Sequence, residues 1–314
     1  MNEEVLRQLL RVTAAGPVSG EQARAALERG KEKLAAGDRD AAAVALREAA
    51  MVPETQLAAH NLIEAENLPG AFSCWMGLDA SIDPKDDVYG FFTGFGAWSS
   101  PMRDYLADGW RTLSELMLLL EQAGRPLVGF KNVLEFASGH GRFTRHLARA
   151  IGAQRVTVSD VVAGAVDFAR AHFGVQGFDS AKLPQDVQWP QQYDLVFVLS
   201  LFSHLPRTTW KPWLARLWEA VAPGGVLVFS THGAEAVRRA GVTLDAEGYF
   251  FAPSSESNAI DVQEYGTAFT SEDFVRAALQ ECAPGVQLLH FAPTWFWTHQ
   301  DAFVVQKTVA GDRA

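Results

Sequence analysis

A stretch with the residue types of a ligand-binding loop stands at 133–147, where VLEFASGHGRFTRHL passes from apolar to glycine-containing to amphipathic. An apolar run ends at Phe136, Gly139 and Gly141 follow, and a helical pattern begins directly after them. Glycines between a strand and a helix let the backbone approach a ligand closely, and the helix aims its N-terminal N–H groups at that ligand. Asp160 ends the next apolar run, where a carboxylate can accept hydrogen bonds from ribose hydroxyls. The stretch therefore predicts a site for a nucleotide-type cofactor.

The elements that must position these residues alternate along the chain. Apolar segments separated by amphipathic helices predict an α/β fold, doubly wound, with helices on both faces of a mostly parallel sheet. The strand segments are NVLEF (132–136), RVTVSD (155–160), VQGFDS (175–180), YDLVFVLSLF (193–202) and GVLVFSTHG (225–233). The tail contains VQLLHFAPTWFW and DAFVVQK, two strands joined by a short turn. We therefore expect a seven-stranded, Rossmann-like sheet with an antiparallel terminal hairpin.

Two cofactors use such a strand–glycine loop–helix unit, a dinucleotide and S-adenosylmethionine. The dinucleotide fingerprint requires a third glycine for close packing of the helix, and Thr144 stands at that position. Glu135 lies just before the loop, where its carboxylate would repel a pyrophosphate but could meet the ammonium group of a methionine moiety. Asp160 suits either cofactor. The sequence therefore favours the sulfonium cofactor.

Longer segments resemble one protein family. YDLVFVLSLFSHLP and LWEAVAPGGVLVFSTHG closely resemble the fourth and fifth strands of class I S-adenosylmethionine-dependent methyltransferases, and the terminal hairpin agrees with that fold. The resemblance covers roughly residues 100–308. The pieces DYLADG, FSHLP, STHG and HQDAFVV resemble the type 11 and type 12 groups of bacterial small-molecule and polysaccharide-biosynthesis enzymes. The family's loop reads acidic-x-Gly-x-Gly-x-Gly, and this chain has Ala137 at the first glycine, which is tolerable if φ stays negative.

The resemblance implies cofactor contacts at the carboxyl ends of the first four strands. Asp160 would accept hydrogen bonds from the ribose, or alternatively cap the following helix. Two residues after the third strand would contact the adenine edge, and two after the fourth would line the adenine or methyl-donor side. An upstream tyrosine hydroxyl would reach the methionine carboxylate, with packing as an equal alternative. The expected contacts are Tyr105, Glu135, Ala137, Ser138, Gly139, Gly141, Asp160, Asp179, Ser180, Leu199 and Ser200.

Histidines follow two of the strands and could serve as a general base. Methyl transfer is an in-line displacement, and a weakly nucleophilic alcohol benefits from a base that titrates near neutral pH. His204 follows the fourth strand and His232 the fifth, at the edge where open α/β sheets bind ligands. Either could act as the base or orient the acceptor, and the alternative is a histidine that only ties loops together. His299, at the terminal hairpin turn, is a third candidate.

An insert at about 232–270, rich in aromatic residues, separates the fifth strand from the last helix. An insert of this length is expected to be functional, here as a substrate cap, although a cap packed on its own aromatic residues is the alternative. Aromatic walls suit sugar faces, aromatic metabolites and acyl chains alike. The residues expected to line the acceptor site are Trp98, Tyr249, Tyr265, Trp295, Trp297 and His299.

The predicted function is methyl transfer from S-adenosylmethionine to a hydroxyl of a saccharide or other small metabolite. N-methylation of an amine or amino sugar is the first alternative, because a neutral amine already carries its lone pair. A non-catalytic binding module with a vestigial loop is the second, favoured by Ala137. A nicotinamide oxidoreductase is the third, and Thr144 argues against it.

Composition limits the partners. The formal net charge of -10, without a basic stripe, argues against nucleic acid. With two cysteines, Cys74 and Cys282, the sequence argues against a disulfide framework and fits a reducing, cytoplasmic location. We expect no signal peptide, no membrane span and no metal site, because no such segment or ligand spacing occurs.

The expected domain organisation has three parts. Residues 1–68 have helical spacing, and a hairpin around Gly37 resembles a single tetratricopeptide repeat, through which the chain could bind a protein partner or associate with itself. Residues 69–124 would form an aromatic cover and a linking helix. Residues 125–314 would form the methyltransferase domain.

Overall fold

The computed structural model describes residues 17–66, 68, 77–94, 101–255 and 260–309. The chain divides into two compact units after Asp108, a position inside helix α7 (Pro101–Gln122). This division differs from the expected boundaries after residues 68 and 124, which stay a prediction.

The described part of the first unit is largely helical. Gly30 of its first helix allows close packing on the second, since a Cβ there would lie 2.5 Å from Cδ2 of Leu46. The predicted hairpin around Gly37 is confirmed, because Gly37 has a φ of 74° and Asp38 caps the second helix. Pro53 begins a third helix, where the sequence had indicated only the end of the second. A protein partner of these helices stays a prediction. The helices, besides the start of α7, are α2 (Gly20–Ala35), α3 (Arg39–Ala49), α4 (Pro53–Ala65) and α6 (Asp87–Gly94).

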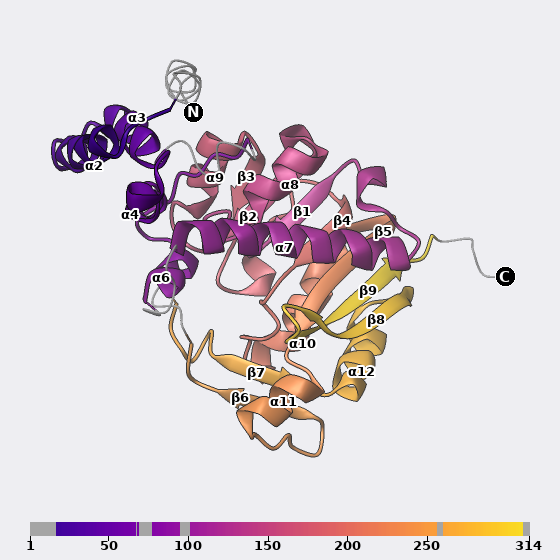
Figure 1. Ribbon diagram of the computed structural model, residues 1–314. Helices are drawn as coiled ribbons and strands as arrows, with labels where there is room; N and C mark the ends of the chain where they lie inside the picture. The colour runs from indigo at the N-terminus through magenta and orange to yellow at the C-terminus, as the bar shows by residue number, and fades with distance from the viewer. Residues whose placement is uncertain (1–16, 67, 69–76, 95–100, 256–259, 310–314) are drawn as a thin grey trace. The chain divides into compact units, whose positions relative to one another are not determined.

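The second unit contains a seven-stranded sheet in the order β3-β2-β1-β4-β5-β9-β8 (Figure 1). The first five strands of the chain pair in parallel, and β9 is antiparallel to both β5 and β8, so the predicted sheet and its terminal hairpin are confirmed. The order reverses between β1 and β4, which is the topological switch point where open α/β sheets bind ligands. The strands are β1 (Val133–Phe136), β2 (Val156–Asp160), β3 (Gln176–Asp179), β4 (Tyr193–Val198), β5 (Val221–Thr231), β8 (Val286–Phe296) and β9 (Gln300–Lys307).

Helices cover both faces of this sheet, which explains why its strands are apolar throughout rather than alternating. One face packs against residues 109–122 of α7 and against α8 and α9, and valines of β1, β2 and β5 share that core. The other face packs against α10 and α12 through phenylalanines of β5 and β9. These helices are α8 (Thr144–Ile151), α9 (Ala165–Phe173), α10 (Arg207–Ala220) and α12 (Glu272–Cys282). Short 3-10 turns, η1 (Leu127–Gly129), η2 (Ala153–Arg155) and η3 (Pro184–Asp186), lie before β1, β2 and β4.

The insert between β5 and α12 is folded in its described part. It contains α11 (Ala234–Ala240) and a two-stranded antiparallel hairpin of β6 (Tyr249–Ala252) and β7 (Thr267–Thr270). The backbone N–H of Ala268 donates to Ser203 O at 2.7 Å and that of Gly266 to His204 O at 2.9 Å. The insert is therefore joined by main-chain hydrogen bonds to the loop that follows β4.

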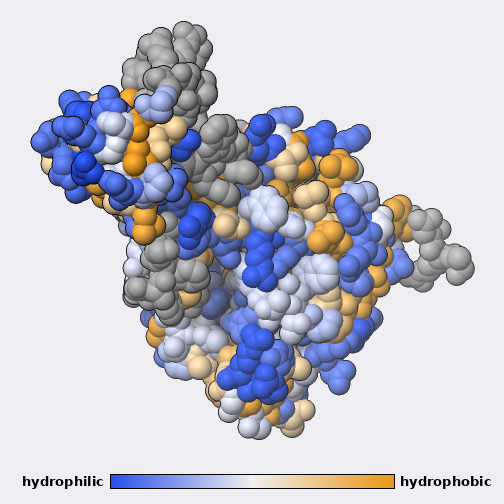
Figure 2. Space-filling model, in the orientation of Figure 1, coloured by the Kyte–Doolittle hydropathy of each residue, from blue (hydrophilic) through white to orange (hydrophobic). Residues whose placement is uncertain are grey.

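Hydrophilic and hydrophobic side chains form small interspersed patches on the described surface drawn in Figure 2. Exposed large apolar residues of the second unit, such as Trp110, Leu118 and Val128, are separate positions of the kind that most soluble surfaces carry. Within the described ranges, no helix combines the length and the apolar character that crossing a membrane requires.

Candidate functional site

The loop between β1 and α8 is held in place by Asp160 at the end of β2. Its Oδ2 accepts a hydrogen bond from Gly139 N at 2.7 Å, and its Oδ1 accepts one from Val162 N at 2.8 Å. Asp160 is 7% exposed; burial raises the pKa of its carboxyl, and the backbone hydrogen bonds lower it. The carboxylate therefore orders the glycine loop, and its oxygens are acceptors of the kind that a ribose hydroxyl needs.

The two glycines of the loop have different surroundings. Both are left-handed, with φ of 54° at Gly139 and 82° at Gly141. A Cβ at Gly139 would meet no atom within 4 Å, whereas a Cβ at Gly141 would lie 2.4 Å from Cε2 of Phe173. Gly139 thus faces open space that a ligand can enter, and Gly141 is needed for packing against α9.

Ala137 has a φ of 60°, so the condition under which an alanine is tolerable here, a negative φ, is not met. A left-handed conformation costs a residue with a Cβ about 1–2 kcal/mol. Ser200, two residues beyond β4, has the same φ of 60°. Because Phe136 and Val198 are register partners in β1 and β4, these two strained residues lie just beyond the ends of adjacent strands at the switch point.

Backbone strain is confined to one edge of the sheet. Among the described non-glycine residues with positive φ, Ala137 and Ser200 follow the carboxyl ends of β1 and β4, Trp297 and Thr298 lie at the β8–β9 turn, and Thr294 lies in β8 where its pairing with β9 is irregular. β9 begins opposite the end of β5. Strain of this kind persists where the surrounding structure enforces it, and it clusters at binding and catalytic sites. These residues are Ala137, Ser200, Thr294, Trp297 and Thr298.

Glu135 is a buried acid beneath the loop. It is 5% exposed, and its Oε2 accepts a hydrogen bond from Thr144 Oγ1 at 2.7 Å. Burial raises the pKa of Glu135 to about 8; the Thr144 bond and Arg142 lower it, and Asp160 raises it. The carboxyl is therefore largely protonated at neutral pH, and a cationic group beside it would favour its ionisation. In the sequence Thr144 was noted only because it replaces a glycine of the dinucleotide fingerprint. In the structure its hydroxyl, in the first turn of α8, donates the hydrogen bond that this buried acid accepts.

The other expected cofactor residues of the second unit lie around this loop. Ser138 is buried, and its N–H points to Ser159 O at 3.3 Å. Asp179 is the register partner of Asp160 at the ends of β3 and β2, and Ser180 N donates to Asp160 O at 2.9 Å. Leu199 is half-buried against the core under α7 and α8. Their roles toward a cofactor stay predictions.

Tyr105 belongs to the first unit. Its hydroxyl donates to Oδ2 of Asp86 at 2.6 Å, and its ring makes edge contacts with Tyr89 and Phe92 at centroid distances of 5.5 Å and 5.9 Å. These contacts give Tyr105 a structural role within its own unit. The expected contact with the cofactor stays a prediction.

The structure brings His204, His232 and His299 together. The ring centroids of His204 and His232 lie 6.1 Å apart, and those of His232 and His299 lie 5.0 Å apart. Nδ1 of His204 is 2.6 Å from Gly266 O, and Nδ1 of His232 is 3.1 Å from Ala268 O. A carbonyl oxygen can only accept, so each Nδ1 carries a hydrogen, and Nε2 is the nitrogen at which each ring gains or loses its second proton.

The surroundings of the two buried histidines differ. Burial, with the positive charge of His204 and then of His299, lowers the pKa of His232 to about 3. His232 is therefore neutral at physiological pH. The ring of Tyr265 stacks on His204 at a centroid distance of 4.4 Å, and its hydroxyl donates to Ser200 O at 3.5 Å. Tyr265, from the insert, thus contacts both the first histidine and the strained end of β4.

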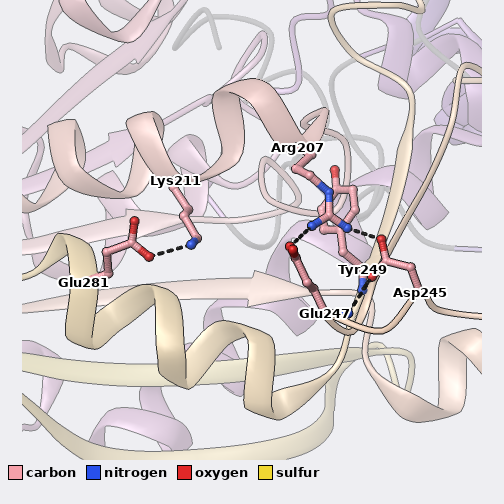
Figure 3. A network of polar contacts seen from close by, with 6 residues as sticks. All are labelled: Arg207, Lys211, Asp245, Glu247, Tyr249 and Glu281. Carbon is pink, nitrogen blue, oxygen red and sulfur yellow. Dashed lines mark hydrogen bonds and ion pairs between the residues drawn. The ribbon is translucent and has the colours of Figure 1, made fainter.

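A polar network anchors the insert at the start of α10 (Figure 3). Arg207 forms ion pairs with Asp245 and Glu247, and its guanidinium lies 4.6 Å from the ring centroid of Tyr249. The hydroxyl of Tyr249 donates to Leu205 O at 2.6 Å. Tyr249 is only 3% exposed, so both its ring and its hydroxyl are engaged in holding the insert. Its expected contact with an acceptor stays a prediction.

The remaining aromatic candidates lie near α7. Trp295 Nε1 donates to Glu115 O at 2.9 Å, and the backbone N–H of Trp297 donates to the Glu115 carboxylate at 3.2 Å. The guanidinium of Arg142 lies 5.2 Å from the ring centroid of Trp297. The structure therefore places both tryptophans on the α7 side of the sheet edge. Trp98 lies outside the described residues.

Sequence reasoning missed Gln300 and Ser230, which complete the site at the end of β4. Ser200 N donates to Ser230 Oγ at 2.9 Å, Ser230 Oγ donates to Gln300 Oε1 at 2.6 Å, and Gln300 Nε2 donates to Ser200 Oγ at 3.0 Å. The available signal was a polar first residue in the apolar strand QDAFVV. Across the ranges that the structure covers, no group of three or more His, Cys, Asp or Glu is arranged to hold a metal ion.

Residues 134–227, from β1 into β5, match the family model of the type 12 methyltransferase domain. The chain carries a class I S-adenosylmethionine-dependent methyltransferase domain. The open space at Gly139 and the buried carboxylate of Asp160 fit its cofactor, S-adenosylmethionine.

Several solved structures are similar to this methyltransferase. DesVI from Streptomyces venezuelae is 16% identical, with 72% of this chain and 98% of that chain covered and a TM-score of 0.47. An S-adenosylmethionine-dependent methyltransferase from Clostridium acetobutylicum is 12% identical, with 64% and 91% covered and a TM-score of 0.45. The N-methyltransferase NodS from Bradyrhizobium japonicum is 18% identical, with 63% and 94% covered and a TM-score of 0.41. No curated protein matches the chain.

Proposed function

We propose that this domain methylates a hydroxyl group of a saccharide or another small metabolite. The observation that carries the proposal is the pair of histidines at the carboxyl ends of β4 and β5. In each ring Nδ1 contacts a carbonyl oxygen of the insert, so Nε2 is the nitrogen that we propose acts toward the acceptor. When bound, S-adenosylmethionine supplies an electrophilic methyl group. An alcohol is a weak nucleophile toward it, and a positioned base that takes the hydroxyl proton contributes about 10²–10⁴-fold to the rate.

The two histidines suit different parts of this reaction. A ring with a pKa of about 3, as in His232, holds a proton poorly. His204, stacked on Tyr265, is the proposed base, and its Nε2 takes the proton of the acceptor hydroxyl. His232 is the proposed orienting group, which accepts a hydrogen bond from the acceptor without becoming charged. His299, which is only partly buried, borders the same group of rings on the acceptor side.

The cofactor is proposed to lie at the switch point between β1 and β4. Asp160 would accept hydrogen bonds from its ribose hydroxyls, and Glu135 would face its ammonium group. Asp179 and Ser180 would border the adenine edge, and Leu199 and Ser200 the opposite side. The open space beside Gly139 supports this placement.

The test compares His204→Gln, His232→Gln and, as control, His290→Gln on the edge strand β8. Methyl transfer from S-adenosylmethionine to methyl glycosides of neutral hexoses and to the matching amino sugars is followed by the mass gain of one methyl group. We expect transfer to a hydroxyl, with turnover lowered about 100-fold or more by His204→Gln, less by His232→Gln and not by the control. Transfer to amines alone, at a turnover that His204→Gln leaves unchanged, would contradict both the acceptor class and the base.

A further inference from the structure

The left-handed backbone of Ser200 is enforced by a closed set of hydrogen bonds from two other strands. The N–H of Ser200 donates to Ser230 Oγ of β5 at 2.9 Å, and the Oγ of Ser200 accepts from Gln300 Nε2 of β9 at 3.0 Å. Ser230 and Gln300 are joined to each other at 2.6 Å. Ser230 is fully buried and Gln300 is 5% exposed, so water does not compete effectively for these bonds.

The donors and acceptors in this set leave the hydroxyl hydrogen of Ser200 with a weaker contact than the other hydrogens. Ser230 Oγ accepts from Ser200 N, and its own hydrogen goes to Gln300 Oε1, which fixes the orientation of the amide. The amide nitrogen then donates to Ser200 Oγ and occupies a lone pair of that oxygen. Within the part of the chain that the structure describes, the hydrogen of Ser200 Oγ has a longer contact, of 3.3 Å, to Gln300 Oε1. A ligand with an acceptor atom at this place would take it at little cost.

The position of Ser200 shows which ligand can use this hydrogen. Ser200 lies two residues beyond Val198, and Val198 is the register partner of Phe136, which precedes the glycine loop. Ser200 is partly exposed, in contrast to Ser230 and Gln300 below it. The serine hydroxyl therefore stands on the β4 side of the switch point, opposite the loop that Asp160 orders on the β1 side.

We propose that Gln300 is a positioning residue of the cofactor site, which holds Ser200 in the left-handed conformation and directs its hydroxyl hydrogen to an acceptor atom of bound S-adenosylmethionine. The inference rests on the proposed placement of the cofactor at the switch point. It adds β9 to the strands that shape this site, although Gln300 follows Ser200 by 100 residues in the chain.

The test measures binding of S-adenosylhomocysteine to the full chain by calorimetry. Gln300→Ala and Ser200→Ala are each expected to weaken binding about 3- to 10-fold, the effect of one neutral hydrogen bond. The double variant is expected to bind no more weakly than either single variant, because Gln300 acts through Ser200. Gln306→Ala is the matched control, since Gln306 lies on the same strand and donates to Gly224 O at the opposite edge of the sheet. Gln300→Met, which fills the same space without the amide, replaces Gln300→Ala should the smaller side chain prevent folding.

The outcomes separate this inference from the placement on which it rests. If the Gln300 variants bind with unchanged affinity while Ser200→Ala and Asp160→Ala bind more weakly, the proposed role of Gln300 is overturned. The placement of the cofactor at the switch point then still holds. Additive losses in the double variant also overturn the role of Gln300, because they show that Gln300 does not act through Ser200. Unchanged affinity in all of these variants overturns the placement of the cofactor itself.

Discussion

The buried carboxyl group of Glu135 makes the stability of the second unit depend on pH in a defined direction. Glu135 is 5% exposed, and burial raises its pKa in the folded protein from the ordinary 4.5 to about 8. In the unfolded chain this carboxyl titrates near its ordinary value. Between the two values the folded state binds more protons than the unfolded state, so the contribution of Glu135 to the free energy of unfolding decreases as the pH rises.

The size of this effect follows from the two pKa values. A difference of one in pKa corresponds to about 1.4 kcal/mol, so the full difference corresponds to about 5 kcal/mol. Between pH 5 and pH 8, the part that is titrated amounts to about 3.5 kcal/mol. Glu135→Gln removes the titration and keeps an oxygen that can accept the hydrogen bond from Thr144. The free energy of unfolding of this variant, relative to that of the unmodified protein, is expected to increase by about that amount from pH 5 to pH 8.

Urea unfolding followed by tryptophan fluorescence measures this difference. Seven of the nine tryptophans follow Asp108, so the signal reports mainly on the second unit. Glu121→Gln is the control, because Glu121 is exposed on α7, and its profile should match that of the unmodified protein. Parallel pH profiles for Glu135→Gln and the unmodified protein would show that Glu135 is already ionised in the folded state, which would refute the reasoning.

Three further predictions concern the glycine loop. Gly141→Ala is expected to destabilise the protein by about 2 kcal/mol or more through overpacking against α9. Gly139→Ala is expected to cost about 1 kcal/mol in stability and to weaken the binding of S-adenosylhomocysteine. If urea unfolding and calorimetric binding show equal effects for the two variants, the two glycines do not have these different roles. Ala137→Gly should raise the free energy of unfolding by up to about 1 kcal/mol, whereas the control Ala277→Gly, at an exposed position of α12, should lower it by about 1 kcal/mol. If both variants lower the free energy of unfolding, Ala137 is not strained. Asp160→Ala should weaken S-adenosylhomocysteine binding by about 1–3 kcal/mol, and unchanged affinity would remove the ribose assignment.

Much of the fold could be predicted because the sheet is covered on both faces. Strands buried on both sides must be apolar throughout, so segments such as YDLVFVLSLF stand out between amphipathic helices. The carboxyl ends of parallel strands share one edge, which is why residues as distant as Asp160 and Gly139 could be expected together. The same rule predicted that His204 and His232 lie at this edge, and in the structure their ring centroids are 6.1 Å apart.

Other features of the site depend on information that residue types do not carry. The φ of Ala137 is set by the loop as a whole, in which its N–H donates to Ser159 O at 2.8 Å, and an alanine in a sequence gives no sign of this. The contact of Gln300 with Ser200 and Ser230 depends on the antiparallel register of β5 and β9, in which a shift by one residue would turn Gln300 to the opposite face. Hydrogen bonds across 70 and 100 residues therefore appeared only in the structure.

The insert holds both histidines through carbonyl oxygens, at Gly266 and Ala268, and every residue type offers the same carbonyl. Gly266 must stay a glycine, because a Cβ there would lie 2.3 Å from Ala252 O, and Ala268 is fully buried. Replacements at Thr267, the partly exposed residue between them, can change the surface of the insert while both carbonyl contacts to the imidazoles are kept. Under the proposed function, a change in acceptor preference and retention of the histidine geometry could therefore evolve separately. A designer who exchanges side chains of this hairpin can vary the first while leaving the second in place.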